Sequence, residues 1–319
     1  MKITILEAAT VSKGDVSFDG LRELGEVTEY PLTPTDKIVQ NVGDAEIVLC
    51  NKTPFTEEVL RACPNIKYIG LCATGYNNID LKTCRELGIT VCNVPAYSSA
   101  AVAQQVFAFI LNFYSRVSEY DGFVRDGGWI RSETFSDFVF PTKEISGKTL
   151  GIIGYGSIGR KVANIARAFG MSVIVNTRTA KQDSSVKFMD VKELFAEADI
   201  ITVHCPLTEE TKGLINKENL ALCKPSCIII NTSRGAVVNE RDLADALNGG
   251  RIAAAALDVL TEEPMSADCP LIGAKNCVIT PHIAWSAFET RERLVKTAIE
   301  NIRAFIAGKP INTVTEQGV

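Results

Sequence analysis

The sequence predicts an α/β protein with two doubly wound parallel-sheet domains and a cleft between them. Short apolar runs rich in β-branched residues alternate with amphipathic stretches along the whole chain, which is typical of parallel sheets covered by helices on both faces. The chain has 319 residues, more than one core usually holds, and 46% of them are apolar. The alternation starts afresh near residue 148, so we expect a second sheet there.

The first series predicts five strands with helices between them. Each strand is a short apolar run, and the helices carry apolar residues at helical spacing. The predicted strands are Ile3–Glu7, Val27–Tyr30, Glu46–Leu49, Ile66–Cys72 and Thr90–Asn93, and the predicted helices are Phe55–Ala62 and Leu81–Leu87.

A long helix is predicted between the two series, over Ser98–Tyr120. Its apolar residues cover nearly all faces, so we expect it to be buried between domains or in a subunit interface. The segment Asp121–Pro141 then becomes polar and aromatic, which indicates a loop or an arm.

The second series predicts six strands, enough for a complete dinucleotide-binding sheet. They are Thr149–Ile153, Ser172–Asn176, Ile200–His204, Ile228–Thr232, Ile252–Leu257 and Cys277–Thr280. A last helix opens with a capping box, Ser286-Ala287-Phe288-Glu289. Because no strand follows this helix, we expect it to pack back on the first domain.

Charge and composition exclude several classes of protein. A net charge of -5 and a pI near 5.3 provide no basic field for nucleic acid or anionic lipid. No apolar stretch approaches the roughly 20 residues that span a bilayer, and the start has no signal-peptide pattern, so we expect a cytoplasmic protein. The ten cysteines are spread out and accompanied by only two histidines, which favours reduced, mostly buried thiols and no metal site.

The turn after the first strand of the second series has the sequence Gly154-Tyr155-Gly156-Ser157-Ile158-Gly159. It joins a strand to the predicted helix Arg160–Phe169, which is the context in which this glycine pattern binds a dinucleotide. The first glycine permits the tight turn, the second lets the backbone approach the pyrophosphate, and the third allows close helix packing. The helix N-terminus adds N–H donors and partial positive charge.

The next strand ends in Thr177-Arg178-Thr179, where a ribose-binding carboxylate is expected. Arg178 can pair with a 2′-phosphate, whereas an Asp there would repel it, so the sequence favours NADP(H) over NAD(H). The alternative is that Arg178 stacks on the adenine or is solvated, and that NAD(H) is accepted.

Motifs along almost the whole chain resemble the D-2-hydroxyacid dehydrogenase family, in particular its glycerate dehydrogenase and hydroxypyruvate reductase branch. They are Ala73-Thr74-Gly75-Tyr76-Asn77-Asn78-Ile79-Asp80, Asn93-Val94-Pro95, the turn at Gly154, His204-Cys205-Pro206-Leu207-Thr208, Asn231-Thr232-Ser233-Arg234-Gly235, Ala256-Leu257-Asp258-Val259, Glu263-Pro264 and Thr280-Pro281-His282. One departure is Ala96, where the family often has Gly.

The resemblance implies a division of the chain. In this family the nucleotide domain is inserted into the substrate domain. Residues 1–98 plus 286–319 would form the substrate domain, a discontinuous one, and 99–285 a Rossmann-like nucleotide domain that includes the helix and arm 98–141. The family uses that region to build a homodimer.

Three residues are implied as catalytic. Arg234 follows an apolar strand and would bind the substrate carboxylate and polarise its 2-oxo group. His282 would exchange a proton with the substrate oxygen. Glu263, favoured over its neighbour Glu262, would hold the imidazole in its tautomer and stabilise its charge.

Further residues are implied at the two ends of the site. Expected cofactor contacts are Gly154, Tyr155, Gly156, Ser157, Ile158, Gly159, Thr177, Arg178, His204, Cys205, Pro206, Thr232, Ser233, Asp258, His282 and Ala284. Expected substrate contacts are Lys52, Ala73, Thr74, Gly75, Arg234 and Trp285; a solvated Lys52 and a core or interface Trp285 are the alternatives.

The activity implied is hydride transfer between a nicotinamide cofactor and a small 2-oxo or 2-hydroxy carboxylate, foremost hydroxypyruvate or glyoxylate. A lactate-type or aryl-lactate-type dehydrogenase is an alternative. A nucleotide-sensing corepressor-like scaffold is a further one, although the long partner-binding tails of such scaffolds are missing here.

Overall fold

The computed structural model describes residues 1–179 and 183–315. The chain divides into two compact units, and each is described by itself. Unit 1 consists of Met1–Ser98 and Trp285–Val319, and unit 2 of Ser99–Ala284. Trp285, expected in the second domain, therefore lies in unit 1, where its ring packs edge-on against Tyr97 with centroids 6.3 Å apart.

Unit 1 is a five-stranded parallel sheet, as the sequence predicted, and its strand order is β2-β1-β3-β4-β5. Its central strands β3 and β4 are buried throughout, because helices cover both faces of the sheet. The strands are β1 Lys2–Ile5, β2 Glu26–Glu29, β3 Ile47–Cys50, β4 Tyr68–Leu71 and β5 Thr90–Cys92; the helices are α1 Ile38–Val42, α2 Glu57–Ala62, α3 Leu81–Glu86 and α10 Phe288–Ile306.

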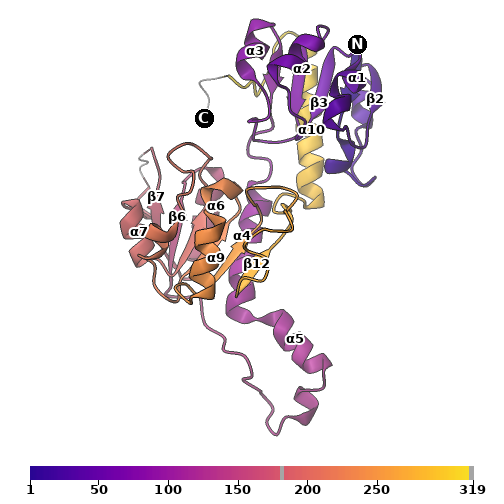
Figure 1. The fold of residues 1–319 in the computed structure, drawn as a ribbon. Helices are drawn as coiled ribbons and strands as arrows, with labels where there is room; N and C mark the ends of the chain where they lie inside the picture. Colours follow the sequence, from indigo (N-terminus) through magenta and orange to yellow (C-terminus); the bar gives the residue numbers. More distant parts are fainter. Residues whose placement is uncertain (180–182, 316–319) are drawn as a thin grey trace. The chain divides into compact units, whose positions relative to one another are not determined.

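The C-terminal helix α10 returns to unit 1, which confirms the prediction for it (Figure 1). Leu294, Val295, Ala298 and Ile302 are buried in one core with Ile3 and other β1 residues. The expected capping box is wrong, because the N-cap is Ala287 and no side chain caps the helix. The Ser286 carbonyl instead accepts a bond from the Arg291 side chain at 2.8 Å.

Unit 2 is a parallel sheet of seven strands, in the order β12-β11-β10-β9-β6-β7-β8. The sequence predicted six; it missed β8, an edge strand of two residues that is too short to show a pattern. The strands are β6 Thr149–Ile153, β7 Ser172–Asn176, β8 Lys187–Phe188, β9 Ile200–Val203, β10 Ile228–Asn231, β11 Ala254–Leu257 and β12 Cys277–Ile279.

Helices cover both faces of this second sheet. One face is packed by α4 Ser99–Ser115 and α6 Ser157–Ala168, and the other by α7 Val191–Glu197, α8 Lys217–Leu220 and α9 Glu240–Asn248. The strand order reverses between β6 and β9. The carboxyl ends of these two strands therefore border the position where such sheets bind ligands.

The long helix predicted over residues 98–120 is two helices. α4 ends at Ser115, Arg116 adopts a left-handed conformation with φ of 52°, and α5 Val117–Arg125 begins after it. Arg116 is held there by Glu119, at 2.7 Å, and its guanidinium lies over the Phe140 ring. Figure 1 shows α5 and the loop after it projecting from the rest of unit 2.

The ten cysteines are all free thiols, and eight of them are buried. Within the part of the chain that the structure describes, no helix is long and apolar enough to cross a membrane.

Candidate active site

The glycine turn after β6 has the shape that the motif predicts. Gly154 has a φ of +96°, and a Cβ there would lie 2.6 Å from the carbonyl carbon of His204, so the turn packs directly on the end of β9. A Cβ at Gly159 would meet the Gly154 oxygen at 2.2 Å, whereas one at Gly156 would meet nothing within 4 Å. No side chain caps α6 at Gly156. The turn leaves open space in front of an uncapped helix N-terminus, as pyrophosphate binding requires.

Two buried polar atoms mark the strand ends beside this turn. The Nδ1 of His204 and the Oγ1 of Thr232 have no hydrogen-bond partner among the described residues. The two residues lie at neighbouring strand ends, because Val203 pairs with Asn231 in the parallel ladder, His204 follows Val203 and Thr232 follows Asn231. Orphaned buried polar atoms are rare, and these fit a cofactor that offers hydroxyl and amide groups.

His204 itself stays uncharged at neutral pH. Burial lowers the pKa of its imidazole to about 3, and its Nε2 lies 3.0 Å from the Thr202 hydroxyl. A histidine held neutral in this way is a poor proton donor near pH 7, so it does not compete with His282 for the acid role.

The end of β7 carries the residues expected to read the ribose. Thr177 is half-buried and Arg178 is exposed. Tyr155 is buried, so a cofactor contact would involve its backbone, while its hydroxyl donates to Asp183 at 2.6 Å. Bonds from Ser185 and Tyr155 lower the pKa of Asp183 to about 2. A negatively charged group therefore lies in the segment after Arg178.

Arg234 follows β10 on a turn that Asn231 organises. The Asn231 side chain is fully buried, accepts the Ser233 amide and hydroxyl at 3.0 and 2.8 Å, and donates to the Arg234 carbonyl at 2.8 Å. No carboxylate pairs with the Arg234 guanidinium within the described ranges, so its charge remains available to an anionic ligand. Sequence reasoning gave Asn231 no role, although its place between a strand and a turn is typical of a side-chain cap.

His282 and Glu263 are in contact. Nδ1 of His282 lies 2.7 Å from Oε2 of Glu263, and Oε1 of Glu263 accepts the Leu260 amide at 3.0 Å. Because a carboxylate only accepts, the shared proton belongs to Nδ1, and Nε2 is left for a ligand. The structure places Glu263, not Glu262, against the imidazole.

Asp258 holds the backbone on which His282 lies. Its carboxylate is buried and accepts the Thr280 hydroxyl at 2.5 Å and the amides of Ile283 and Ala284, both at 2.8 Å. Its carbonyl accepts the His282 amide at 2.8 Å. His282 has a φ of 56°, which a residue with a side chain adopts only when its surroundings impose it. Asp258 was expected to touch the cofactor; that contact stays a prediction, whereas its structural bonds were not foreseen.

The remaining expected cofactor contacts lie near these turns. Ser157, at the start of α6, has its hydroxyl 3.1 Å from that of Ser99, and Ile158 is half-buried. Cys205 and Ala284 are buried, and Pro206 is exposed. Burial raises the pKa of the Cys205 thiol to about 11, so it is not a reactive thiolate.

Apart from Arg234, which belongs to unit 2, the expected substrate residues lie in unit 1. Thr74 donates to the Val94 carbonyl at 2.7 Å, and the Ala73 carbonyl accepts the Val94 amide at 2.9 Å, so loop 73–75 is anchored on the segment after β5. Ala96 in that segment has a φ of 56°, a left-handed conformation that favours glycine, which is the residue that the family resemblance led us to expect there.

Lys52 lies in a loop that one carboxylate organises. Its side chain is exposed, and the Glu7 Oε2 accepts three successive amides, those of Asn51, Lys52 and Thr53, at 2.8, 2.8 and 2.9 Å. Glu7 was read only as the end of a strand. The contact spans more than forty residues of sequence, so no local pattern indicates it.

Comparison with known proteins adds a family to this geometry. The sequence model of "D-isomer specific 2-hydroxyacid dehydrogenase, NAD binding domain" matches residues 107–284. The chain is also 42% identical to a hydroxypyruvate reductase from Blautia hydrogenotrophica, over 99% of this chain and 100% of the relative. The chain belongs to the D-isomer specific 2-hydroxyacid dehydrogenase family.

Membership confirms the family that the motifs indicated. This D-2-hydroxyacid dehydrogenase is an NAD(P)-dependent oxidoreductase that acts on the CH–OH group of its donor. It is 40% identical to a glyoxylate reductase from Thermococcus litoralis, over 89% of this chain and 87% of that protein. It superposes with a TM-score of 0.88 on an acyclic imino acid reductase in complex with NADPH and D-Arg, 32% identical over 98% of this chain and 100% of that one.

Proposed function

We propose that the protein reduces hydroxypyruvate or glyoxylate to the corresponding hydroxy acid. The observation that supports this most directly is the contact between His282 and Glu263. Arg234 follows a strand of the same sheet. The three residues follow β10, β11 and β12, which are neighbours in one parallel sheet, so their carboxyl ends lie along the same edge. The relatives named hydroxypyruvate reductase and glyoxylate reductase favour these two substrates.

The chemistry assigned to the residues is a proton transfer beside a hydride transfer. A bound nicotinamide cofactor supplies the hydride. Arg234 binds the substrate carboxylate and polarises the 2-oxo group. Nε2 of His282 donates its proton to the carbonyl oxygen, which becomes the hydroxyl, and Glu263 stabilises the imidazolium before the transfer. In the oxidation direction Nε2 accepts that proton.

We propose unit 2 as the nucleotide-binding domain and unit 1 as the substrate domain. The glycine turn, the orphaned atoms of His204 and Thr232, and the match to an NAD-binding family model support the first assignment. The substrate contacts of Lys52, Ala73, Thr74, Gly75 and Trp285 stay predictions.

For the cofactor we propose NADP(H) in preference to NAD(H). Arg178 follows β7, where a carboxylate would repel a 2′-phosphate, and a related protein of known structure holds NADPH. Asp183, which is held close to the glycine turn by Tyr155, argues the other way, so the preference should be modest.

Initial rates test substrate and cofactor together. NADH and NADPH oxidation would be measured with hydroxypyruvate, glyoxylate, pyruvate and phenylpyruvate. The proposal expects the largest kcat/KM for hydroxypyruvate or glyoxylate with NADPH. Faster turnover of pyruvate or phenylpyruvate would move the protein to the lactate-type or aryl-lactate-type enzymes, and faster rates with NADH would overturn only the cofactor preference. No turnover of any of these four acids would overturn the substrate proposal and would point to a different hydroxy acid or to the scaffold alternative.

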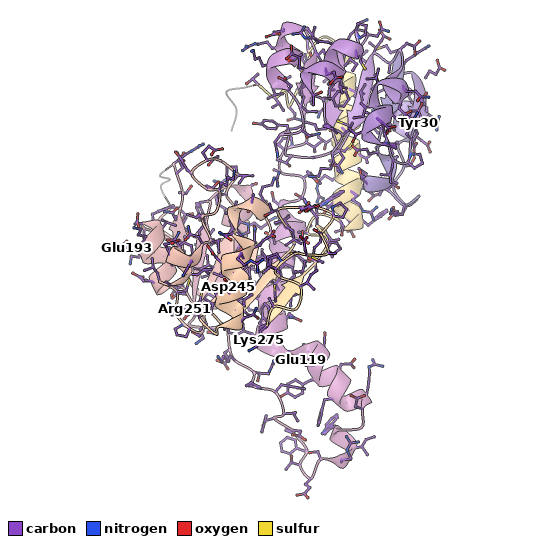
Figure 2. All side chains as sticks on the ribbon, in the orientation of Figure 1. Tyr30, Glu119, Glu193, Asp245, Arg251 and Lys275 are labelled. Atoms are coloured by element: carbon purple, nitrogen blue, oxygen red, sulfur yellow. The ribbon has the colours of Figure 1, made fainter. Side chains whose placement is uncertain are left out.

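We also propose a homodimer and a cytoplasmic location. The segment after α5 exposes large apolar side chains, including Ile130 at 88%, Phe135 at 91% and Phe138 at 88%. Figure 2 shows the side chains beyond Glu119 projecting away from the rest of unit 2. Apolar surface of this extent is usually buried by a partner. Ten unpaired thiols suit a reducing compartment.

A further inference from the structure

Glu263, the carboxylate of the proposed catalytic pair, lies on a loop whose position depends on contacts with residues outside the loop. Glu263 belongs to the segment between β11 and β12, and Thr261, Glu262 and Glu263 are all exposed. Within the loop, Glu263 bonds the Leu260 amide. The position of its carboxylate beside His282 therefore depends on how firmly the backbone of residues 260–263 is held.

Glu240, the first residue of α9, supplies such a support. Its Oε1 accepts the Thr261 amide at 2.7 Å, and its Oε2 accepts the thiol of Cys269 at 3.8 Å. These two contacts lie on either side of Glu263 in the chain. One half-buried carboxylate thus ties both ends of the segment that carries Glu263.

The same helix start is linked to Arg234. A short 3-10 turn, Gly235–Val237, leads from Arg234 toward α9. A Cβ at Gly235 would lie 1.8 Å from the carbonyl carbon of Leu260, so the two backbones touch next to the Glu240 bond. The loop of Glu263 is therefore fixed to the element that carries the substrate-binding cation.

We propose that Glu240 is a positioning residue that keeps Glu263 bonded to His282. This rests on the proposed catalytic role of that pair. Glu240 acts through the Thr261 amide and the loop backbone, not on substrate or cofactor. Without its carboxylate the loop shifts, the imidazolium of His282 loses part of its stabilisation, and proton donation slows. The glycine turn at residues 154–159 is left unchanged, so nucleotide affinity should be retained.

Three substitutions at this position separate the bond from the charge. Glu240→Ala removes the acceptor, Glu240→Asp keeps the charge but shortens its reach by one methylene, and Glu240→Gln keeps an acceptor at the right distance. A positioned general acid such as His282 contributes roughly 10² to 10⁴ in rate. A shift of the loop that carries Glu263 should cost a part of this, about tenfold in kcat for the Ala and Asp variants. Gln should restore kcat to within about twofold.

The measurements are kcat, KM and the pH profile of kcat/KM for hydroxypyruvate reduction, and NADPH affinity by fluorescence titration; if another 2-oxo acid turns over faster, it replaces hydroxypyruvate. For Ala and Asp, the fall of the rate at alkaline pH should begin at lower pH, because less of His282 stays protonated. NADPH affinity should stay within about twofold of wild type, since the glycine turn is untouched.

Asp242→Ala is the matched control. Asp242 lies in the same helical turn and accepts the Lys217 amide at 3.0 Å, away from Glu263, so its loss should leave the pH profile unchanged. Equal effects of the two alanine variants, or wild-type kcat in both Ala and Asp, would overturn the proposal. If the Ala variant does not fold, the Asp and Gln variants decide in the same way. His282→Ala tests the proposed function separately, because wild-type turnover there would refute the pair itself.

Discussion

Glu262 and Glu263 are adjacent carboxylates of which only one is bonded to His282. We expect Glu263→Gln to lower kcat by about 10²-fold, toward the lower end of what a positioned acid contributes, because an amide stabilises the imidazolium less than a carboxylate does. Steady-state rates with NADPH at pH 7 measure this. Glu262→Gln is the matched control and should keep wild-type rates; if it lost as much activity as Glu263→Gln, the assignment would be wrong.

His204 should make the fold sensitive to acid. The pKa of its imidazole in the folded protein, about 3, lies below the ordinary 6.5, so the unfolded chain takes up the proton first as the pH falls. Its contribution to stability is complete above pH 6.5 and is lost as the pH falls toward 3, by up to about 1.4 kcal/mol per pH unit.

Urea unfolding between pH 7 and pH 5 measures this effect. The free energy of unfolding should fall less steeply with acid in His204→Gln than in the wild type. Identical slopes for His204→Gln and the wild type would show that His204 is not held neutral.

At the scale of elements, the turn between β6 and α6 assigns different tasks to its glycines. Gly156→Ala should leave the free energy of unfolding unchanged, because its Cβ meets no atom within 4 Å, yet weaken NADPH binding by occupying the space before the helix N-terminus. Gly159→Ala should cost about 1–3 kcal/mol, since its Cβ would collide with the Gly154 carbonyl oxygen.

Urea unfolding and fluorescence titration of the two variants separate these effects. Gly159→Ala should lose more stability than Gly156→Ala, whereas Gly156→Ala should lose more NADPH affinity, measured per folded protein. Undiminished NADPH affinity of the Gly156→Ala variant would show that the nucleotide does not bind at this turn.

Local pattern predicted most elements, and two of its failures occur where particular side-chain contacts set the backbone. The five strands of unit 1 and six of the seven strands of unit 2 were predicted from apolar runs. The end of α4 was not predicted, because arginine is not a helix-breaking residue. The contacts of Arg116 with Glu119 and Phe140 hold it in the left-handed conformation that ends the helix. The N-cap of α10 was misread for a similar reason, since Ser286 contributes its carbonyl and not its hydroxyl.

At the scale of the whole molecule, the exposed arm predicts association. We expect the wild-type protein to sediment as a dimer at micromolar concentration, and the double variant Phe135→Asp and Phe138→Asp as a monomer, because charge opposes burial of these side chains. Leu32→Asp is the control, as Leu32 is a 63% exposed side chain outside the arm, and it should leave the dimer intact. A wild-type monomer at this concentration would contradict the prediction.

The sequence by itself determined the α/β class, the family, the glycine turn and the residue types of the candidate site. These features depend on apolar periodicity and short motifs, which involve residues close together in the chain and can therefore be recognised in the sequence. The tertiary structure alone decided which carboxylates organise the loops that carry the candidate residues in each unit. Glu7, Asp258 and Glu240 each bond backbone amides at least twenty residues away in the chain. Such contacts form only when whole elements pack together, so no short sequence motif contains both partners.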